Sequence, residues 1–400
     1  MLAAEAVYAA DGRFEISQAS IPLVITNGGS YILTENVTGV SGTNGITILA
    51  DDVSIDLNGF NLIGVAGSRD GVSVPTNSYL KNIEVFNGAV RSWGDDGVDL
   101  FTTSNSVLSD LGVFSNANTG AKAGFNSVVQ RCRVFRNGGI PGPQPATTNL
   151  LGQGIDVENG SIIRQCIVWQ NNSHGISAHS GSVLQDTILW GNGHDGFHGS
   201  HATTVQGSIA GRNSEGIEID SGGQILNCVA SDNSEDGLRC KADTNAFAVA
   251  GGITINGSLA FRNGDNGVDM AGPGCQLANS LIYSNVGHGV RTSSGCMVLQ
   301  SLVAFNGETA ASDDGIHVYG MGGRVEGNHV VWNYDRGIQL ENGATGGSGN
   351  FIARNTLQGN DSGTPLSFSA GFTNHGYQVT IATGGAMPAG DPWANFFTLP

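Results

Sequence analysis

The sequence predicts an all-β fold, a single right-handed parallel β-helix with coils of about 21 residues, an N-terminal cap and a packed C-terminal tail. Tetrads that open with glycine recur at steps of 21, 21, 20 and 21 residues, at Gly154, Gly175, Gly196, Gly216 and Gly237. Shortly before each later tetrad stands an asparagine: Asn171, Asn192, Asn213 and Asn233. The runs between are short, β-branched and bounded by Gly, Asn and Ser, which indicates strands rather than helices.

One coil can be followed from Ser161 to Ala178. It holds three short apolar runs separated by the small Cys166 and by a turn that ends at Gly175. Three strands in about 21 residues describe one coil, each coil pairs with the next at about 4.8 Å, and crossover handedness favours a right-handed helix. Five residues before the repeat asparagines runs a row of small or polar residues, which we interpret as an inward ladder at a coil corner: Cys132, Cys166, Thr187, Ser208, Cys228, Ser258, Ser280, Ser301 and Asn328.

The chain divides into three parts. Residues 1–44 do not repeat and are expected to cap the open end of the stack, as solenoids require. Residues 45–360 form the β-helix. Residues 361–400 are a Gly- and Ser-rich tail whose Trp393, Phe396 and Phe397 are expected to pack back on the stack or on a neighbouring chain.

Composition limits the partners. The 400 residues carry a net charge of −17 and only 13% charged residues, which argues against nucleic acid or an anionic membrane surface. No apolar run reaches the length of a membrane span. The segment Val7-Tyr8-Ala9 resembles the end of a signal-peptidase site, so we expect a secreted or cell-surface protein whose leader has been trimmed. The cysteines are interpreted as free and buried, although Cys132 with Cys166, or Cys275 with Cys296, could be close enough for a disulfide.

The tetrads, the ladder and the coil length resemble right-handed parallel β-helix proteins of pectate-lyase-like architecture. Within that group the chain resembles secreted bacterial β-helix repeat proteins of mostly unassigned function, in segments such as Asp56-Leu57-Asn58-Gly59-Phe60 and Asp391-Pro392-Trp393-Ala394-Asn395-Phe396. The resemblance implies the fold and a polysaccharide substrate. It does not fix the activity, because this scaffold hosts many.

Three insertions interrupt the repeat: Gly139–Gly152, Ala242–Gly252 and Gly307–Asp314. All three flank the strand of the Gly-Ile-x-Val tetrads, and long loops on a repeat scaffold usually mark its working face. We therefore expect a groove on this strand face. In pectate-lyase-like families the same face is the substrate cleft.

In each tetrad the third residue points outward, and this outward row and the next are rich in ionisable groups. The expected catalytic residues are Lys241, Arg239 and His198, the expected substrate-binding residues are His179, Asp269, Arg291 and His317, and the expected metal ligands are Glu218 and Asp220. Side chains on adjacent strands are about 4.8 Å apart, so they can interact directly.

Such a patch suits β-elimination from a uronic-acid polymer. The reaction needs a cation or arginine on the uronate carboxylate, a base for the C5 proton and an acid for the leaving oxygen. Glu218 and Asp220 could hold calcium through oxygen ligands. Lys241 beside Arg239 is expected to have a lowered pKa, which suits a base. Some β-helix lyases are similar in using Lys or Arg as base beside carboxylate-held calcium.

Two alternatives stand beside the lyase. A glycoside hydrolase would need two or three carboxylates, which Glu218, Asp220 and Asp269 could supply. A non-catalytic glycan-binding or cell-surface solenoid needs no chemistry, since alternating charges also simply pair across a sheet. The expected partner is a polysaccharide, acidic for the lyase. The sequence leaves a monomer and a homotrimer equally open.

Overall fold

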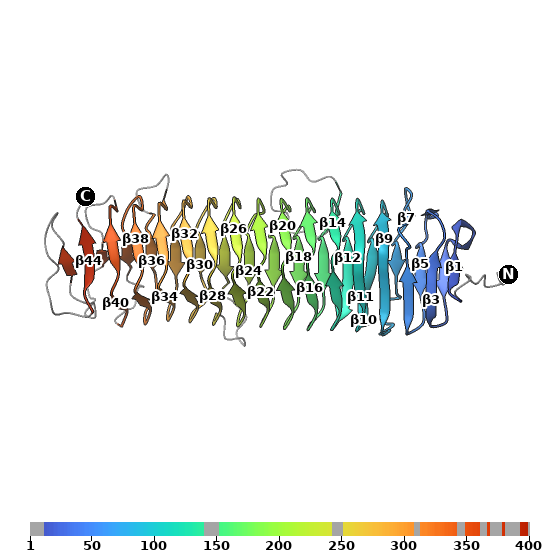
Figure 1. Cartoon of the computed structure of the whole chain (residues 1–400), viewed down its shortest axis with the longest axis horizontal. Coiled ribbons are helices and arrows are strands. Elements are labelled where there is room, and N and C mark those ends of the chain that lie inside the picture. Colours follow the sequence, from blue (N-terminus) through green and yellow to red (C-terminus); the bar gives the residue numbers. More distant parts are fainter. Residues whose placement is uncertain are drawn as a thin grey trace. The chain divides into compact units, whose positions relative to one another are not determined.

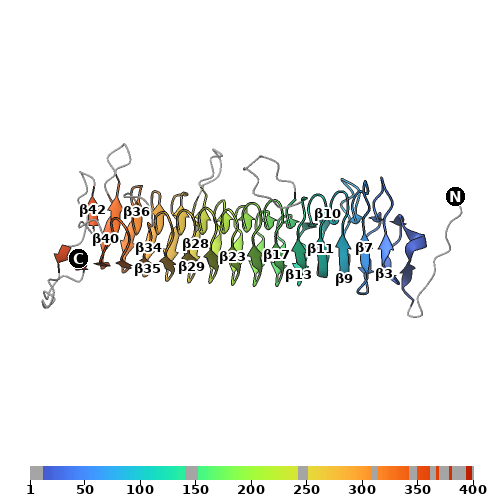
Figure 2. The ribbon, with the colours of Figure 1, turned by 90° about the horizontal axis from the view of Figure 1, so that it is seen from above.

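A computed structural model describes residues 12–139, 152–241, 251–307, 313–341, 349–360, 366–368, 378–380 and 393–398. The chain divides into two compact units, residues 1–199 and 200–400. In each unit the strands stack side by side, as Figures 1 and 2 show. Most residues of the three insertions, the first eleven residues and most of residues 361–400 lie outside the described residues.

In the first unit the tetrad strands form one parallel sheet, called the tetrad sheet. Its strands are β2 (Leu23–Ile25), β5 (Ile46–Ile48), β8 (Val72–Ser73), β10 (Val98–Ser104), β12 (Ala121–Phe125), β15 (Ile155–Val157), β18 (Ile176–Ala178) and β21 (Phe197–Gly199). Each residue of β15 pairs with the equivalent residue of β18 one coil later, as Asp156 does with Ser177. The register therefore keeps equivalent repeat positions in line.

The remaining strands of the first unit form the second sheet, again parallel, with the 3-10 helix η1 (Gln18–Ser20) between β1 and β2. They are β1 (Phe14–Ile16), β3 (Gly29–Leu33), β4 (Val37–Thr38), β6 (Val53–Asp56), β7 (Asn61–Ile63), β9 (Ile83–Arg91), β11 (Val107–Phe114), β13 (Val128–Gln130), β14 (Arg133–Phe135), β16 (Ile162–Arg164), β17 (Ile167–Trp169), β19 (Val183–Gln185) and β20 (Ile188–Trp190).

The second unit repeats this plan. Its tetrad sheet holds β24 (Ile217–Ile219), β27 (Leu238–Cys240), β30 (Val268–Met270), β33 (Val290–Thr292), β36 (Ile316–Val318), β39 (Ile338–Leu340) and β42 (Leu366–Phe368). Its second sheet holds β22 (Thr204–Gln206), β23 (Ile209–Gly211), β25 (Gln224–Leu226), β26 (Val229–Ser231), β28 (Thr254–Asn256), β29 (Leu259–Phe261), β31 (Gln276–Ala278), β32 (Leu281–Tyr283), β34 (Met297–Leu299), β35 (Leu302–Ala304), β37 (Arg324–Glu326), β38 (His329–Val331), β40 (Phe351–Ala353), β41 (Thr356–Gln358), β43 (Gln378–Thr380) and β44 (Asn395–Thr398).

The core follows from the alternation within each tetrad strand. In β15 and β24 the first and third residues are fully buried, Ile155 with Val157 and Ile217 with Ile219. The repeat glycine before each strand is required by close approach: a Cβ on Gly154 would lie 2.5 Å from the carbonyl oxygen of Gly175, the equivalent glycine one coil later. The repeating glycine and apolar pattern thus has a direct steric cause.

The repeat asparagines form a buried ladder at the corner before the tetrad strand. Asn137 Nδ2 donates to Asn171 Oδ1 at 2.9 Å, and Asn171 Nδ2 donates to Asn192 Oδ1 at 3.0 Å. In the second unit Asn263 Nδ2 donates to Asn285 Oδ1 at 2.9 Å. Each side-chain amide thus donates a hydrogen bond to the equivalent amide of the next coil. These bonds offset the free-energy cost of burying the polar groups.

The predicted fold class, an all-β right-handed parallel β-helix with coils of about 21 residues, is confirmed. The six cysteines are buried free thiols, as interpreted from the sequence. Strands within residues 12–44 pair in parallel with the strands that follow, as β2 does with β5. The division into a cap at 1–44, a body at 45–360 and a tail at 361–400 stays a prediction.

Candidate functional site

The tetrad sheet of the second unit places alternating charges in register. Glu218 pairs across the sheet with Arg239, Arg239 with Asp269, and Asp269 with Arg291. These residues occupy the third position of their tetrads, on strands β24, β27, β30 and β33. Their side chains therefore point away from the core on neighbouring strands.

Arg239 is the centre of this cluster. Its guanidinium forms ion pairs with Glu215 and, at 3.5 Å, with Glu218. It also lies 3.9 Å from Asp236 Oδ2 and 4.0 Å from Asp269 Oδ2. One arginine thus faces four carboxylates, and Arg291 Nη1 lies 3.7 Å from Asp269 Oδ2 on the far side.

Burial separates the two signs of charge within the cluster. The side chains of the four carboxylates Glu215, Glu218, Asp236 and Asp269 are only 4–7% exposed. The cations above them are open to solvent: Arg239 is 31% exposed, Lys241 45% and Arg291 47%. The surface that a ligand meets is therefore basic, although the carboxylates beneath keep the cluster near neutrality.

Two of the four buried carboxyls, Asp236 and Asp269, hold their protons more tightly than usual. Burial, with the nearby Asp269 carboxylate, raises the pKa of Asp236 to about 7. Burial also raises the pKa of Asp269, against the opposing effect of Arg291 and Arg239. Groups that titrate near neutrality can exchange protons with a substrate.

The expected lowering of the Lys241 pKa is wrong. Burial does act to lower it, but the Glu218 carboxylate 3.0 Å away and the charge of Asp220 outweigh both burial and Arg239. The net direction is upward, so Lys241 keeps its proton at neutral pH. It is therefore unsuited to be the base and suited to donate a proton or bind an anion.

His317 lies one strand beyond Arg291, with which it is in register. Its Nδ1 is 2.8 Å from Asp314 Oδ2 and its Nε2 is 3.6 Å from Glu341 Oε2. The centroids of the His288 and His317 rings are 4.5 Å apart, and the ring planes are tilted by 41°. Burial lowers the pKa of His288 to about 4, so this imidazole is neutral at neutral pH.

The other expected site residues belong to the first unit. His179 Nδ1 lies 3.3 Å from Glu158, and its ring contacts Phe101 edge-on. His198 Nδ1 lies 3.6 Å from Asp195 Oδ2. The structure brings Glu218, Asp220, Arg239, Lys241, Asp269 and Arg291 together in the second unit. A single patch that also includes His179 and His198 stays a prediction.

Sequence reasoning missed the residue immediately before each repeat glycine. Six of these residues are buried and ionisable. Five of them pair with the outward row, namely Asp96, Asp195, Glu215, Asp236 and Asp314, and His174 pairs with Asp195.

The first unit holds a small pocket on its tetrad sheet. It has a volume of about 190 Å³ and is lined by Asp99, Lys122 and Asp156 together with Phe101 and three other residues. Lys122 Nζ lies 2.6 Å from Asp96 Oδ2. Burial raises the pKa values of Asp96 and Asp156 to about 6 each. Two carboxyls that titrate near neutrality thus flank one lysine.

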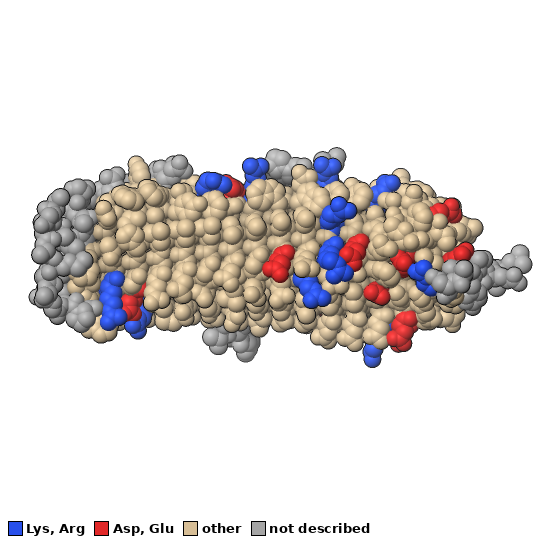
Figure 3. All heavy atoms as spheres, viewed as in Figure 1, with Lys and Arg blue, Asp and Glu red and all other residues tan. Residues whose placement is uncertain are grey.

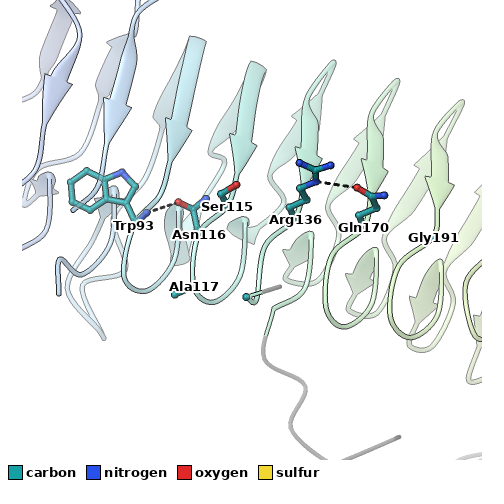
Figure 4. A pocket seen from close by; sticks show the side chains of 8 residues that line it. Trp93, Ser115, Asn116, Ala117, Arg136, Gln170 and Gly191 are labelled. Carbon is teal, nitrogen blue, oxygen red and sulfur yellow. Dashed lines mark hydrogen bonds between the residues drawn. The ribbon is translucent and has the colours of Figure 1, made fainter. Parts of the chain in front are cut away.

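A larger pocket of about 770 Å³ lies at the asparagine corner of the first unit (Figure 4). The Trp93 backbone N–H donates to Asn116 Oδ1 at 3.1 Å, and Arg136 Nε donates to Gln170 Oε1 at 3.1 Å. Arg136 is the one charged side chain among its lining residues. The pocket has no acid–base pair, so it is a weaker candidate for chemistry than the tetrad sheet.

Figure 3 shows one face of the molecule, on which uncharged side chains predominate and basic side chains often lie beside acidic ones. Two ion pairs in or next to strands of the second sheet are Arg131 with Asp110 at 2.7 Å and Arg262 with Asp232 at 2.8 Å. Both are largely exposed pairs of one acid and one base. They lack the buried carboxylates that distinguish the cluster around Arg239.

The fold and the repeated tetrads define the chain as a right-handed parallel β-helix protein. The model of the family described as "Right handed beta helix region" matches residues 22–187. No protein of curated function matches the sequence. None of the helices formed by the described residues is long and apolar enough to cross a membrane.

Solved structures of similar fold act on or bind carbohydrates, by their names. The A-module of the Azotobacter vinelandii mannuronan C-5 epimerase AlgE6 is 18% identical, with 94% of this chain and 91% of that chain covered and a TM-score of 0.53. A tailspike protein of E. coli bacteriophage HK620, in complex with a pentasaccharide, is 13% identical, with 95% and 74% covered and a TM-score of 0.49. At this identity the likeness to the epimerase module shows the fold alone.

Proposed function

We propose that the protein acts on an acidic polysaccharide and cleaves it by β-elimination on the tetrad sheet of the second unit. One observation carries the proposal: Arg239, Lys241 and Arg291 are the exposed members of a cluster whose carboxylates are buried. An anionic chain laid on this surface would meet cations first. The name of one similar structure, a mannuronan C-5 epimerase module, favours a polysaccharide as the ligand.

A chain of net charge −17 should repel an acidic ligand. The local charge of the cluster can reduce this repulsion. If all groups were ionised, the three cations would face five carboxylates: Glu215, Glu218, Asp220, Asp236 and Asp269. Burial raises the pKa of Asp236 to about 7, so this carboxyl is partly protonated near neutral pH. The negative charge of the cluster is thereby reduced, and its cations are the members that face solvent.

The roles follow from these positions. Arg239 and Arg291 would hold the uronate carboxylate and so acidify the proton on C5. Both arginines now pair with Asp269, at 4.0 and 3.7 Å. When the substrate carboxylate takes them over, the pKa of Asp269 rises further, which strengthens it as a base.

Lys241 would serve as the acid. Its pKa is raised, chiefly by Glu218, over the opposing effect of burial, so it enters the reaction protonated. Asp269 takes the C5 proton, the electron pair of that bond forms the C4–C5 double bond, the C4–O bond breaks, and the leaving oxygen takes a proton from Lys241. One new reducing end and one unsaturated uronate result from each cleavage.

Calcium binding by Glu218 and Asp220 stays a proposal. The cations Lys241 and Arg239 compete with calcium for the Glu218 carboxylate. The two oxygens of Glu218 already face Lys241 at 3.0 Å and Arg239 at 3.5 Å. The two arginines can neutralise the substrate carboxylate without a metal. We therefore infer that the reaction at this cluster needs no calcium. Activity should then survive a chelator.

A matched pair of polymers tests the proposal. Binding to a polyuronate is compared with binding to the same polymer after its carboxyl groups are reduced to alcohols. The expected result is that only the acidic form binds and that Arg291→Ala weakens binding at least about tenfold. Arg262→Ala should not weaken it, because Arg262 directly follows β29 of the second sheet and pairs with Asp232. Equal binding of both polymers, or equal loss in both variants, would refute the assignment.

Glycoside hydrolysis is the second candidate, favoured by the small pocket of the first unit. Asp99 and Asp156 lie on either side of Lys122 in register, hence about 9–10 Å apart along the sheet. That spacing is near the range of inverting glycosidases, and the Asp156 carboxyl, whose pKa burial raises to about 6, suits a general acid. Reducing ends without unsaturated product, lost in Asp156→Asn, would select this reaction.

A further inference from the structure

The two units share a pattern of histidine and aspartate that the proposed function does not use. In each unit a histidine precedes one repeat glycine, an aspartate precedes the next, and a second histidine follows that next glycine by two positions. The first set is His174, Asp195 and His198, and the second is His288, Asp314 and His317. The same three repeat positions, on successive coils, thus bring together the same three side chains.

In the first unit Asp195 lies at the centre of three imidazoles. His174 Nδ1 is 3.1 Å from Asp195 Oδ2, His194 Nδ1 is 2.8 Å from Asp195 Oδ1, and His198 Nδ1 is 3.6 Å from Asp195 Oδ2. The His174 ring lies 4.5 Å from the His194 ring and 5.2 Å from the His198 ring. Ligand atoms of His174, His194 and Asp195 all fall within 4.8 Å of one another.

His174 supplies an independent sign of a ligand. The residue is 5% exposed, and its Nδ1 makes no hydrogen bond within the part of the chain that the structure describes. That nitrogen nevertheless faces Asp195 at 3.1 Å. A buried polar atom without a hydrogen bond is costly, and a cation between the nitrogen and the carboxylate would satisfy it.

The second unit repeats the geometry with its own partners. His317 Nδ1 lies 2.8 Å from the buried carboxylate of Asp314, and the His288 and His317 rings are 4.5 Å apart. The Asp314 backbone N–H donates to His288 Nδ1 at 2.8 Å, which fixes the orientation of that ring and leaves Nε2 as its ligand atom. Ligand atoms of His288, Asp314 and His317 lie within 4.8 Å of one another.

We propose that each unit binds one divalent transition-metal ion of the zinc class, at His174, His194 and Asp195 with His198 beside them in the first unit, and at His288, Asp314 and His317 in the second. Imidazole nitrogen with one carboxylate oxygen is a ligand set that zinc takes, whereas calcium requires six or more oxygens. The two sites are independent of the polysaccharide proposal, which uses neither set of residues.

The exposure of the ligands indicates an accessible site. The side chains of His174 and Asp195 are 7% and 1% exposed, while those of His194 and His198 are 42% and 23% exposed. Two ligands are therefore held by the fold and two lie at the surface, from which an ion can enter. Replacing a surface ligand should leave the fold intact.

Metal counting on the full chain tests the proposal. The protein is stripped with a chelator, dialysed, and titrated with Zn²⁺ by calorimetry, and bound zinc is counted after gel filtration. The expected result is two ions per chain. His194→Ala and His198→Ala each weaken one site at least about tenfold, His288→Ala weakens the other, and His329→Ala, an exposed histidine on β38, changes neither.

Cobalt provides a readout of geometry, because Co²⁺ in a tetrahedral nitrogen and oxygen site absorbs visible light. Loss of half of the visible signal in His194→Ala, with an unchanged metal-free melting temperature, supports the first site. One ion that is lost only in His288→Ala would overturn the first site and retain the second. Absence of zinc binding, or binding that all four variants share with the parent, would overturn the proposal.

Discussion

Replacing Asp236 by asparagine should stabilise the protein at neutral pH and not at acid pH. Asp236 Oδ1 accepts hydrogen bonds from the Asn266 backbone N–H at 3.0 Å and from Asn266 Nδ2 at 2.9 Å. An asparagine oxygen can accept both bonds. The variant therefore keeps the local structure and removes only the buried charge.

The magnitude follows from the pKa. Burial and Asp269 raise the pKa of Asp236 from 3.8 to about 7, so the folded state holds a proton that the unfolded state releases between these two values. Stability then falls as pH rises through this window. A difference of about three in pKa corresponds to about 4 kcal/mol at pH 7 and above. The figure is an upper bound, because Arg239 lies 3.9 Å away and favours the charged carboxylate.

The assay is denaturant unfolding at pH 4.0 and pH 7.5. The parent should lose more stability than Asp236→Asn on going from pH 4.0 to pH 7.5, by about 2–4 kcal/mol. Asp232→Asn is the control, since the Arg262 hydrogen bond outweighs the small effect of burial and lowers the pKa of that carboxyl. Parallel pH profiles for the parent and Asp236→Asn would refute the account of the buried carboxylates.

Three further outcomes are expected. Asn171→Ala leaves the amide of Asn137 and the Val134 carbonyl without their ladder partner and should cost at least about 3 kcal/mol in urea unfolding, whereas a cost below 1 kcal/mol would contradict the ladder. Gly175→Ala places a Cβ 2.6 Å from the Gly196 carbonyl oxygen and should lower the melting temperature by several degrees in calorimetry; an unchanged value would contradict the close approach. Lys241→Ala should abolish turnover with the fold intact, and Lys241→Arg should keep substrate binding but lose turnover, because arginine does not release its proton; a fully active Lys241→Arg in a steady-state assay would exclude Lys241 as the acid.

The fold could be predicted because its causes are local and repeated. The residues of each Gly-Ile-x-Val tetrad determine which side chains are buried. The register between successive coils repeats the same pattern of burial along the sheet. Hence the outward placement of Glu218, Arg239 and Asp269 followed from counting residues. The neighbours of Arg239 across the sheet followed too, since strand spacing is fixed.

The chemistry of the cluster could not be predicted in the same way. Lys241 was assigned a lowered pKa from one neighbour, Arg239, but the nearer Glu218 carboxylate reverses the direction. Asp236 and Asp195, which adjoin repeat glycines, were not among the predicted site residues. Their burial depends on how the corner of the coil folds over the tetrad strand. The periodicity of the sequence does not predict this.

The most direct test of the central claim is incubation of the protein with a polyuronate while unsaturated product and reducing ends are followed together, with and without chelator. The account predicts that both signals rise in step, that chelator leaves them unchanged, and that Asp269→Asn, which keeps the size and polarity of the side chain, abolishes both while still binding the polymer. Reducing ends without unsaturated product, or full activity of Asp269→Asn, would contradict β-elimination at this cluster.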